Sequence, residues 1–122
     1  MKTLYLPLKK EWYDLIECGR KLEEYREVKP YWISRLCTFK NGRKIKRLTS
    51  RYYADNIEIL KYLLWAGEII FSPYRSVQFS YGYTRRIMVF SIKGIEIGQG
   101  SLDFGAPENK ETFIIGLGER RA

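Results

Sequence analysis

Histidine is absent from this chain of 122 residues. Its absence excludes a Ser-His-Asp triad, a Cys-His dyad and a zinc ion held by imidazole. Cysteine is scarce too, because Cys18 and Cys37 are too few for a four-cysteine zinc site and do not form a CxxC pair. A disulfide is not expected in a reducing compartment, so both thiols are expected to fill apolar volume in the core.

Long apolar runs are also missing. No stretch approaches the ~18 residues that a membrane-spanning helix needs. The first seven residues, MKTLYLP, lack the apolar core and the small-residue cleavage site of a secretory signal peptide. The sequence therefore predicts a cytoplasmic protein without a membrane partner.

Acidic residues are outnumbered, with 14 Asp and Glu against 22 Lys and Arg and a formal charge of +8. A basic domain attracts polyanions through long-range steering and counterion release, so RNA or a nucleotide is the expected partner. The alternative is a basic surface that only keeps the protein soluble. No cofactor and no metal-ligand set is predicted.

The first third of the chain predicts a strand, a helix and a second strand. Residues 3–8 are rich in Leu and Tyr, and residues 9–18 carry apolar side chains at helical spacing. Gly19 stands where a left-handed helix end is favoured. Residues 22–28 are strong helix formers, but they lie between that glycine and Pro30, so a strand is favoured over a helix.

The middle of the chain predicts a short helix after Pro30, a basic turn at Asn41-Gly42 and a second helix. Asp55 with Glu58 resembles a capping box at the start of that helix, and Gly67 would end it. Its buried stripe would consist of Ile57, Leu60, Leu63 and Leu64.

The C-terminal half predicts strands at residues 69–71, 76–81, 87–93 and 112–117. A Gly82-Tyr83 turn joins two of them, and residues 103–111 form a loop. No domain boundary is visible, so residues 1–122 are expected to form a single domain. Helices in front and several antiparallel strands behind predict an α+β fold with a small curled or closed sheet.

Three sets of residues are candidates for function. Lys21, Glu24 and Arg26 could form a polar site in which Lys21 is a base or electrostatic stabiliser and Glu24 carries a proton, or in which the cations hold an anion. The alternative interpretation of this segment is a solvated charged strand or helix turn without a function of its own. A nuclease version would need a divalent metal on carboxylates such as Glu23 or Glu24.

The other two sets combine cations with tyrosines, which suits phosphate contacts and base stacking. The first of these sets lies in the basic segment 40–47 around the Asn41-Gly42 turn and consists of Arg43, Lys44, Lys46 and Arg47. The predicted turn contributes Tyr83 and Arg85. The alternatives are a basic loop without a ligand and ordinary packing at the strand ends. A third possibility is a protein-interaction surface on the helix that follows Asp55.

The order of these pieces resembles a known family. Gly19-Arg20-Lys21-x-x-Glu24-x-Arg26 is similar to the GxKxxExR signature of the ASCH domains of bacteria and their phages. Pro30-Tyr31-Trp32 with Arg35-Leu36, the residues around Gly82 and the segment 113–118 add to the resemblance. It covers residues 3–38 and 76–118, so residues 39–75 are expected to be a basic, helical insertion.

The resemblance implies a PUA-like small β-barrel with short flanking helices and a cleft lined by the signature. It also implies a role with RNA. Some ASCH relatives hydrolyse N4-acetylcytidine with a lysine, a threonine and a glutamate, and one branch is a metal-dependent ribonuclease. Lys21 matches the catalytic lysine and Arg26 matches an arginine of the motif, whereas Glu24 stands where those enzymes have the threonine.

Overall fold

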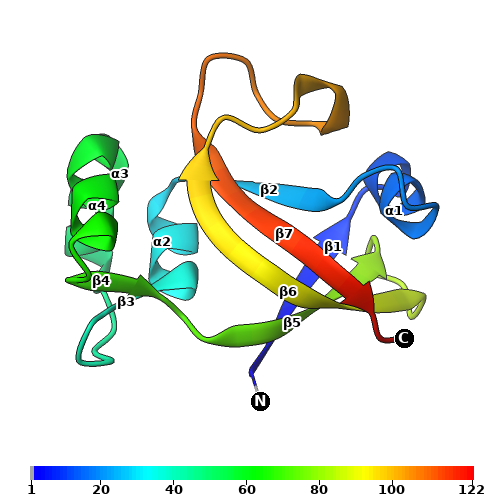
Figure 1. Ribbon diagram of the computed structural model, residues 1–122, viewed down its shortest axis with the longest axis horizontal. Helices are drawn as coiled ribbons and strands as arrows, with labels where there is room; N and C mark the ends of the chain where they lie inside the picture. The colour runs from blue at the N-terminus through cyan, green and yellow to red at the C-terminus, as the bar shows by residue number, and fades with distance from the viewer. Residues whose placement is uncertain (1) are drawn as a thin grey trace. The chain divides into compact units, whose positions relative to one another are not determined.

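The computed structural model describes residues 2–122 of the chain. Its contacts divide into two compact units, Met1–Tyr25 with Pro73–Ala122 (unit 1) and Arg26–Ser72 (unit 2). The described residues form four α-helices, seven strands and one 3-10 turn (Figure 1). The predicted α+β class is confirmed, and the single-domain organisation stays a prediction.

Unit 1 is built on a curled sheet of five strands that resembles half of a barrel (Figure 1). The strands are β1 (Lys2–Leu8), β5 (Tyr74–Tyr81), β6 (Ile87–Gly98), β7 (Thr112–Arg120) and β2 (Glu23–Glu27), in this spatial order. The last two residues of β2 are counted with unit 2. The pairs β5–β6 and β6–β7 are antiparallel, as predicted.

The pairing of β1 with β5 is parallel, which differs from the predicted antiparallel sheet. Leu4 pairs with Val77, and the whole of unit 2 lies between them in the sequence. A parallel pair requires a crossover of a dozen or more residues, and the intervening segment supplies it. Local patterns cannot show which strands meet, so this feature was not predictable from strand periodicity.

The curl of the sheet comes from irregular pairing between β6 and β7. The register shifts twice, between Phe90 and Ile92 and again between Ile92 and Gly94. Such bulges bend a strand and increase its twist. At the bend Ser91 Oγ accepts the backbone N–H of Glu119 at 2.8 Å. A Cβ on the neighbouring Gly118 would lie 2.4 Å from Ser91 Oγ, so a larger residue there would displace this hydroxyl from its hydrogen bond.

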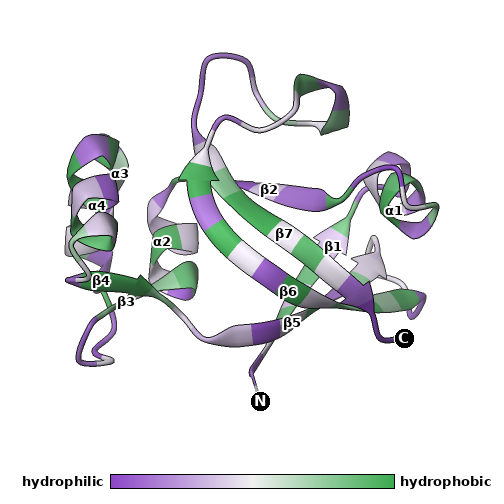
Figure 2. Cartoon of the chain, in the orientation of Figure 1, coloured by the Kyte–Doolittle hydropathy of each residue, from purple (hydrophilic) through white to green (hydrophobic). Residues whose placement is uncertain are grey.

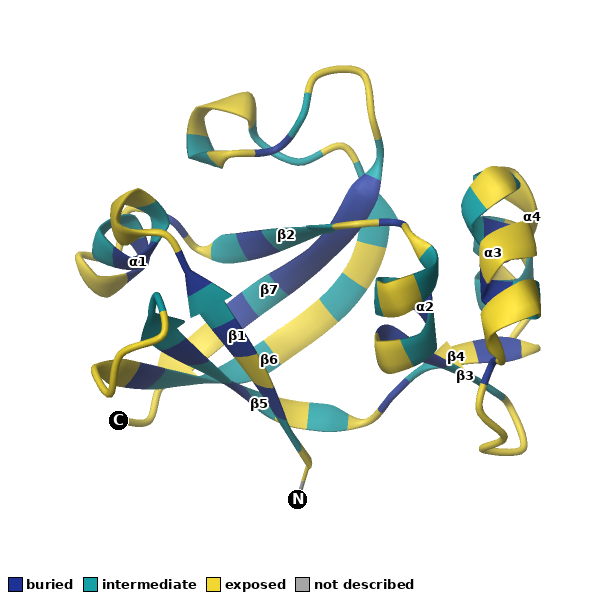
Figure 3. Ribbon diagram, turned by 180° about the vertical axis from the view of Figure 1, so that it is seen from behind, coloured by how far each residue is buried: buried dark blue, intermediate teal, exposed yellow. Residues whose placement is uncertain are grey.

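The core of unit 1 is formed by buried side chains of the sheet and of the first helix. In β1, Leu4, Leu6 and Leu8 are buried while Tyr5 is exposed, which is the alternation of a strand with one covered face. The first half of β7 is apolar and buried, and its end is polar and exposed (Figures 2 and 3). Both β6 and β7 extend beyond their predicted ends. The added residues of β6, 94–98, pair with the buried first half of β7, and β7 itself continues into the exposed residues Glu119 and Arg120.

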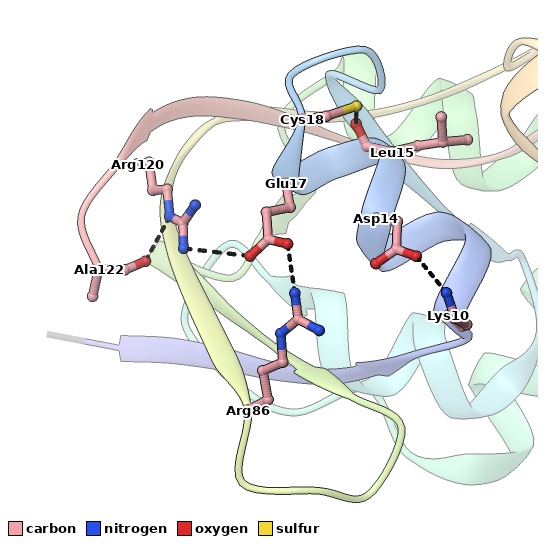
Figure 4. A network of polar contacts seen from close by, with 8 residues as sticks. All are labelled: Lys10, Asp14, Leu15, Glu17, Cys18, Arg86, Arg120 and Ala122. Atoms are coloured by element: carbon pink, nitrogen blue, oxygen red, sulfur yellow. Dashed lines mark hydrogen bonds and ion pairs between the residues drawn. The ribbon is translucent and has the colours of Figure 1, made fainter.

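Helix α1 (Lys10–Glu17) follows β1 and ends at Gly19, whose φ of +84° is the predicted left-handed conformation. Glu17 near its end accepts a hydrogen bond from the Arg86 guanidinium at 2.6 Å, and Arg120 approaches the same carboxylate at 4.0 Å (Figure 4). The Arg86 guanidinium also lies over the ring of Tyr13, 5.1 Å from its centroid. These contacts attach α1 to the sheet.

The two cysteines have different environments. Cys37 is buried, as predicted, and burial raises the pKa of its thiol to about 12. The prediction is wrong for Cys18, which is exposed at the end of α1 and donates a weak hydrogen bond to Leu15 O at 3.4 Å. The last buried position of α1 is Ile16, so the helix turns residue 18 toward solvent.

Unit 2 contains α2 (Pro30–Leu36), β3 (Cys37–Phe39), α3 (Arg47–Asp55), α4 (Ile57–Trp65) and β4 (Ile69–Phe71). The strands β3 and β4 pair antiparallel, with Cys37 opposite Phe71. The core of the unit is made of Ile33, Leu36, Cys37, Ile45, Leu60 and Ile69. Tyr62 and Trp65 of α4 are exposed, and the interaction surface considered for this helix stays a hypothesis.

The structure corrects the predicted start of the second helix of this region. Asp55 ends α3, a helix that the sequence pattern did not indicate, and α4 begins two residues later at Ile57. Asn56 takes the N-cap position of α4, and its side chain donates instead to Tyr52 O at 2.8 Å. Of the predicted stripe, Leu60 is buried and its other members are only partly covered.

Candidate functional site

The first candidate site is the buried ion pair of the signature segment. Beyond Gly19 the chain turns sharply, because the backbone N–H groups of Arg20 and Lys21 both donate to Leu15 O at 3.0 Å. This turn directs Lys21 inward at the start of β2, and its side chain is only 2% exposed. The structure therefore rejects the solvated-surface interpretation for Lys21.

Lys21 and Glu24 face each other at close range. Lys21 Nζ lies 3.0 Å from Glu24 Oε1, and the Glu24 side chain is 7% exposed. The ammonium also lies 4.5 Å from the centroid of the Trp12 ring and 5.4 Å from that of Tyr25. Cation–π contacts strengthen when water is excluded, so the rings offset part of the desolvation cost. A cation and a carboxylate are thus held together beside two aromatic rings, with little exposure to solvent.

Tyr25 attaches the loop after β6 to β2. Its hydroxyl donates to Glu23 Oε1 at 2.6 Å and accepts the backbone N–H of Ser101 at 3.1 Å. Burial, and then the hydrogen bond to the carboxylate, raises the pKa of Tyr25 to about 12. A Cβ at Gly100 would come within 2.5 Å of the Tyr25 ring, so the loop can approach this closely only with glycine.

Arg26, the third signature residue, belongs to unit 2 and is only half-buried. Its guanidinium lies 5.2 Å from the centroid of the Trp32 ring. This contact connects the signature to α2, because Trp32 lies in the first turn of that helix. The structure thus pairs Lys21 with Glu24 and gives Arg26 an aromatic neighbour of its own.

The second candidate site is a cleft of about 970 Å³ in unit 2. One wall comes from α2 with Tyr31, Ser34 and Arg35, whose i, i+3 and i+4 spacing places them on one helix face. The opposite wall comes from α3, where Arg47 and Arg51 are four residues apart on one face. The remaining lining residues are Lys29, Pro30, Lys44, Lys46, Ala54 and Asp55. Six lysines and arginines therefore surround the cleft, against one carboxylate.

A second, smaller cleft of about 460 Å³ lies at the basic turn. The turn is formed as predicted, with Asn41 Oδ1 accepting the N–H of Arg43 at 2.9 Å and Gly42 at a φ of +86°. Its lining residues are Phe39, Lys40, Asn41, Arg43, Lys44, Lys46, Thr49 and Glu68. Glu68 pairs with Lys40 at 3.1 Å, which leaves the other cations to face the solvent.

Charge is distributed unevenly between the units. Unit 2 has ten of the 22 lysines and arginines but only four of the 14 acidic residues, so it carries +6 of the chain's +8. Within residues 2–122, six cations that line the two clefts have no ion-pair partner, namely Lys29, Arg43, Lys44, Lys46, Arg47 and Arg51. Crowded, unpaired cations create a positive potential that attracts anions.

The two predicted residues of the turn between β5 and β6 lie in unit 1. Tyr83 is 96% exposed, and Arg85 is exposed next to it. Thr84 Oγ1 donates to Tyr81 O at 2.7 Å and holds the turn. Neither residue lines the clefts described above, which are formed entirely by unit 2. The structure thus brings Arg43, Lys44, Lys46 and Arg47 together along the two clefts, and Tyr83 and Arg85 belong to the other unit.

Sequence reasoning missed part of the larger cleft. Lys29, Tyr31 and Arg35 line it, although the sequence pattern singled out only the basic segment that follows. The available signal was the helical spacing of Tyr31 and Arg35 directly after Pro30. This spacing alone does not indicate a cleft, because the opposite wall comes from α3.

Comparison with models of protein families, with curated proteins and with solved structures gives no match for this chain. No family is therefore assigned. In the described residues, no three acidic or cysteine side chains gather as a metal-binding group. No helix in the same part of the chain is both long and apolar enough to span a bilayer.

Proposed function

We propose that this protein binds RNA or a nucleotide, as an ASCH-type domain built on a PUA-like barrel. The observation that carries the proposal is the charge of unit 2, where six cations surround a cleft of about 970 Å³. A ligand with several phosphate groups can contact many lysines and arginines at once, and RNA and nucleotides are ligands of this kind. The curled sheet of unit 1 and the signature from Gly19 to Arg26 support the ASCH-type assignment.

A cytoplasmic location belongs to the same proposal. Both Cys18 and Cys37 are free thiols, which suits a reducing compartment. RNA and nucleotides are available there. Secretion into an oxidising compartment would expose Cys18, which lies at the surface, to disulfide exchange.

The test is the salt dependence of binding to a fluorescently labelled RNA, measured by anisotropy. Affinity is expected to fall steeply between ~50 and ~200 mM salt, since binding releases condensed counterions. In the variant Arg47→Ala/Arg51→Ala, the slope of log K against log salt is expected to decrease by roughly 1.4, or ~0.7 per lost phosphate contact on a single strand. The absence of binding, or binding that ignores salt, would overturn the proposal.

A matched control variant is Arg75→Ala/Lys93→Ala, which removes the same charge from exposed positions of unit 1. It tests whether net charge alone explains binding. We expect its salt slope and affinity to remain close to those of the unmodified protein. Equal losses in the two double variants would show that the clefts of unit 2 have no special role.

A second candidate function is an enzyme that acts on a modified nucleoside or on RNA. The observation that favours it is the buried pair of Lys21 and Glu24. Replacing a buried ion pair by apolar residues is often neutral or stabilising, so stability alone does not explain such a pair. Lys21 would serve as the base or as an electrostatic stabiliser, and Glu24 would carry the proton.

This second function is tested with N4-acylated cytidines and single-stranded RNA, each with and without Mg²⁺ or Mn²⁺. Turnover that is lost in Lys21→Met and Glu24→Gln, while both variants remain folded by circular dichroism, would support it. Turnover that persists in both variants would remove the pair from the reaction. The cleft variant Arg47→Ala/Arg51→Ala should change KM for RNA more than kcat.

A further inference from the structure

The two clefts of unit 2 share part of their lining. Lys44 and Lys46 border both the cleft at the basic turn and the larger cleft between α2 and α3. The clefts therefore meet along the segment that leads from β3 into α3. Two adjoining hollows of about 460 and 970 Å³ provide more room than a single phosphate or a single nucleotide requires.

The cations along these clefts are arranged as a series. Lys40 and Arg43 line the cleft at the basic turn, and Lys44 and Lys46 line both clefts. The larger cleft adds four more cations, namely Lys29, Arg35, Arg47 and Arg51. All of them are exposed, and Lys40 pairs with the carboxylate of Glu68. A series of exposed cations favours a ligand whose negative charges are also arranged in a series.

The larger cleft also offers an aromatic surface. The Tyr31 side chain lines it and is 55% exposed. The Trp32 ring meets that of Tyr31 edge to face, with centroids 4.8 Å apart, and the Arg35 guanidinium lies 5.4 Å from the Tyr31 centroid. The tyrosine is thus held in place by its neighbours while much of it stays accessible. An exposed ring beside phosphate-binding cations is the arrangement on which nucleobases stack.

We propose that the two clefts form one continuous binding track for single-stranded RNA, with Tyr31 as a stacking platform for a base. This inference rests on the proposed RNA-binding function and adds the form of the ligand and the residue that contacts its base. A single strand can turn a base out onto an aromatic ring, whereas a duplex keeps its bases stacked inside and presents mainly its backbone. The track therefore selects single strands.

The experiment compares Tyr31→Ala, Tyr31→Phe and Tyr5→Ala in anisotropy titrations with labelled RNA. Tyr5 is an exposed tyrosine of β1 in unit 1 and serves as the matched control. Tyr31→Ala is expected to weaken binding of a single strand roughly tenfold, in the range of a lost base–aromatic stack, and Tyr31→Phe should retain the affinity. Tyr5→Ala should change nothing.

An abasic strand of the same length keeps the phosphates and lacks the bases. Tyr31→Ala should not affect its affinity, because no base is left to stack. A length series from one to ten nucleotides should show affinity that rises with each added nucleotide until the track is filled. A duplex of the same sequence should bind more weakly than the single strand.

The outcomes separate this inference from the proposed function. If no RNA binds, both fail. If RNA binds but a duplex binds as tightly as a single strand, or one nucleotide reaches full affinity, the track is wrong while RNA binding stands. Equal effects of Tyr31→Ala and Tyr5→Ala, or equal losses with abasic and normal strands, would remove Tyr31 from base contact.

Discussion

Replacing Lys46 by serine should make the protein more stable and a weaker binder at the same time. Lys46 occupies the N-cap of α3 with φ −72° and ψ 164°, has no side-chain cap hydrogen bond, and is followed by a first turn without an acidic residue. A serine hydroxyl in this extended conformation can accept an unpaired N–H of that turn. The gain is about 1 kcal/mol, which raises Tm by roughly 4 °C in a chain of this size.

The same substitution removes a charge from the point where the two clefts meet. Lys46 lines both clefts and has no ion pair among the described residues. Losing one phosphate contact on single-stranded RNA should lower the salt slope by ~0.7 and reduce affinity at low salt. Lys46→Asp should enlarge both effects, since an anion at a helix N-terminus adds about 0.3–1 kcal/mol of stability and reverses the local charge.

Circular dichroism melts give the stability, and anisotropy titrations at several salt concentrations give the binding. Lys46→Ala separates the two causes, because it removes the charge without supplying a cap and should weaken binding with no gain in Tm. Lys93→Ser replaces an exposed lysine of β6 in unit 1 and controls for the loss of one positive charge elsewhere in the protein. A lower Tm for Lys46→Ser than for Lys46→Ala would refute the capping argument, and unchanged affinity would refute the place of Lys46 in the track.

Three further predictions concern unit 1 and the thiols. Lys21→Ala should cost roughly 3–5 kcal/mol in the free energy of unfolding, because it leaves Glu24 buried without its cation, and Lys21→Met/Glu24→Leu should recover most of that loss in urea titrations. A thiol reagent should modify one cysteine of the native protein quickly, the exposed Cys18, and Cys37 only after unfolding, with Cys18→Ser abolishing the fast phase. Tyr25 has a native pKa of about 12 against ~10 in the unfolded chain, so its contribution to stability is complete below pH ~10 and is lost as the pH rises toward 12. Tyr25→Phe should reduce the fall in urea midpoint between pH 9 and pH 11, and an unchanged fall would contradict the assignment.

Elements with strong local signals were predictable from the sequence. The strand at residues 3–8 and the helix that ends at Gly19 have clear apolar periods and a glycine with positive φ, and both are confirmed. Helix α3 was not predictable, because its basic first turn has neither a cap nor an acidic residue. It is stabilised by burying Ser50 and Tyr53 within unit 2, and such tertiary contacts override a weak local propensity.

The candidate sites were also predictable from the sequence only in part. The short charged segment that follows Gly19 brought Lys21 and Glu24 into one hypothesis, and the structure places their charged atoms 3.0 Å apart. The enclosing ring of Trp12 comes from α1, and no pattern in the sequence connects that helix with the start of β2. The basic segment was visible as a run of charge, whereas the wall that carries Tyr31 required knowledge of how α2 packs on α3.

The parallel pairing of β1 with β5 also determines the order in which the chain can fold during synthesis. Unit 2 is one uninterrupted segment, and all of its contacts become possible once Ser72 has left the ribosome. The N-terminal strand must wait, because its partner in the sheet begins only at Tyr74. Until then its three buried leucines have no sheet to cover them, so the growing chain exposes an apolar strand at its N-terminus throughout the synthesis of unit 2. A nascent chain halted before residue 74 should therefore be a better substrate for chaperones than the finished protein.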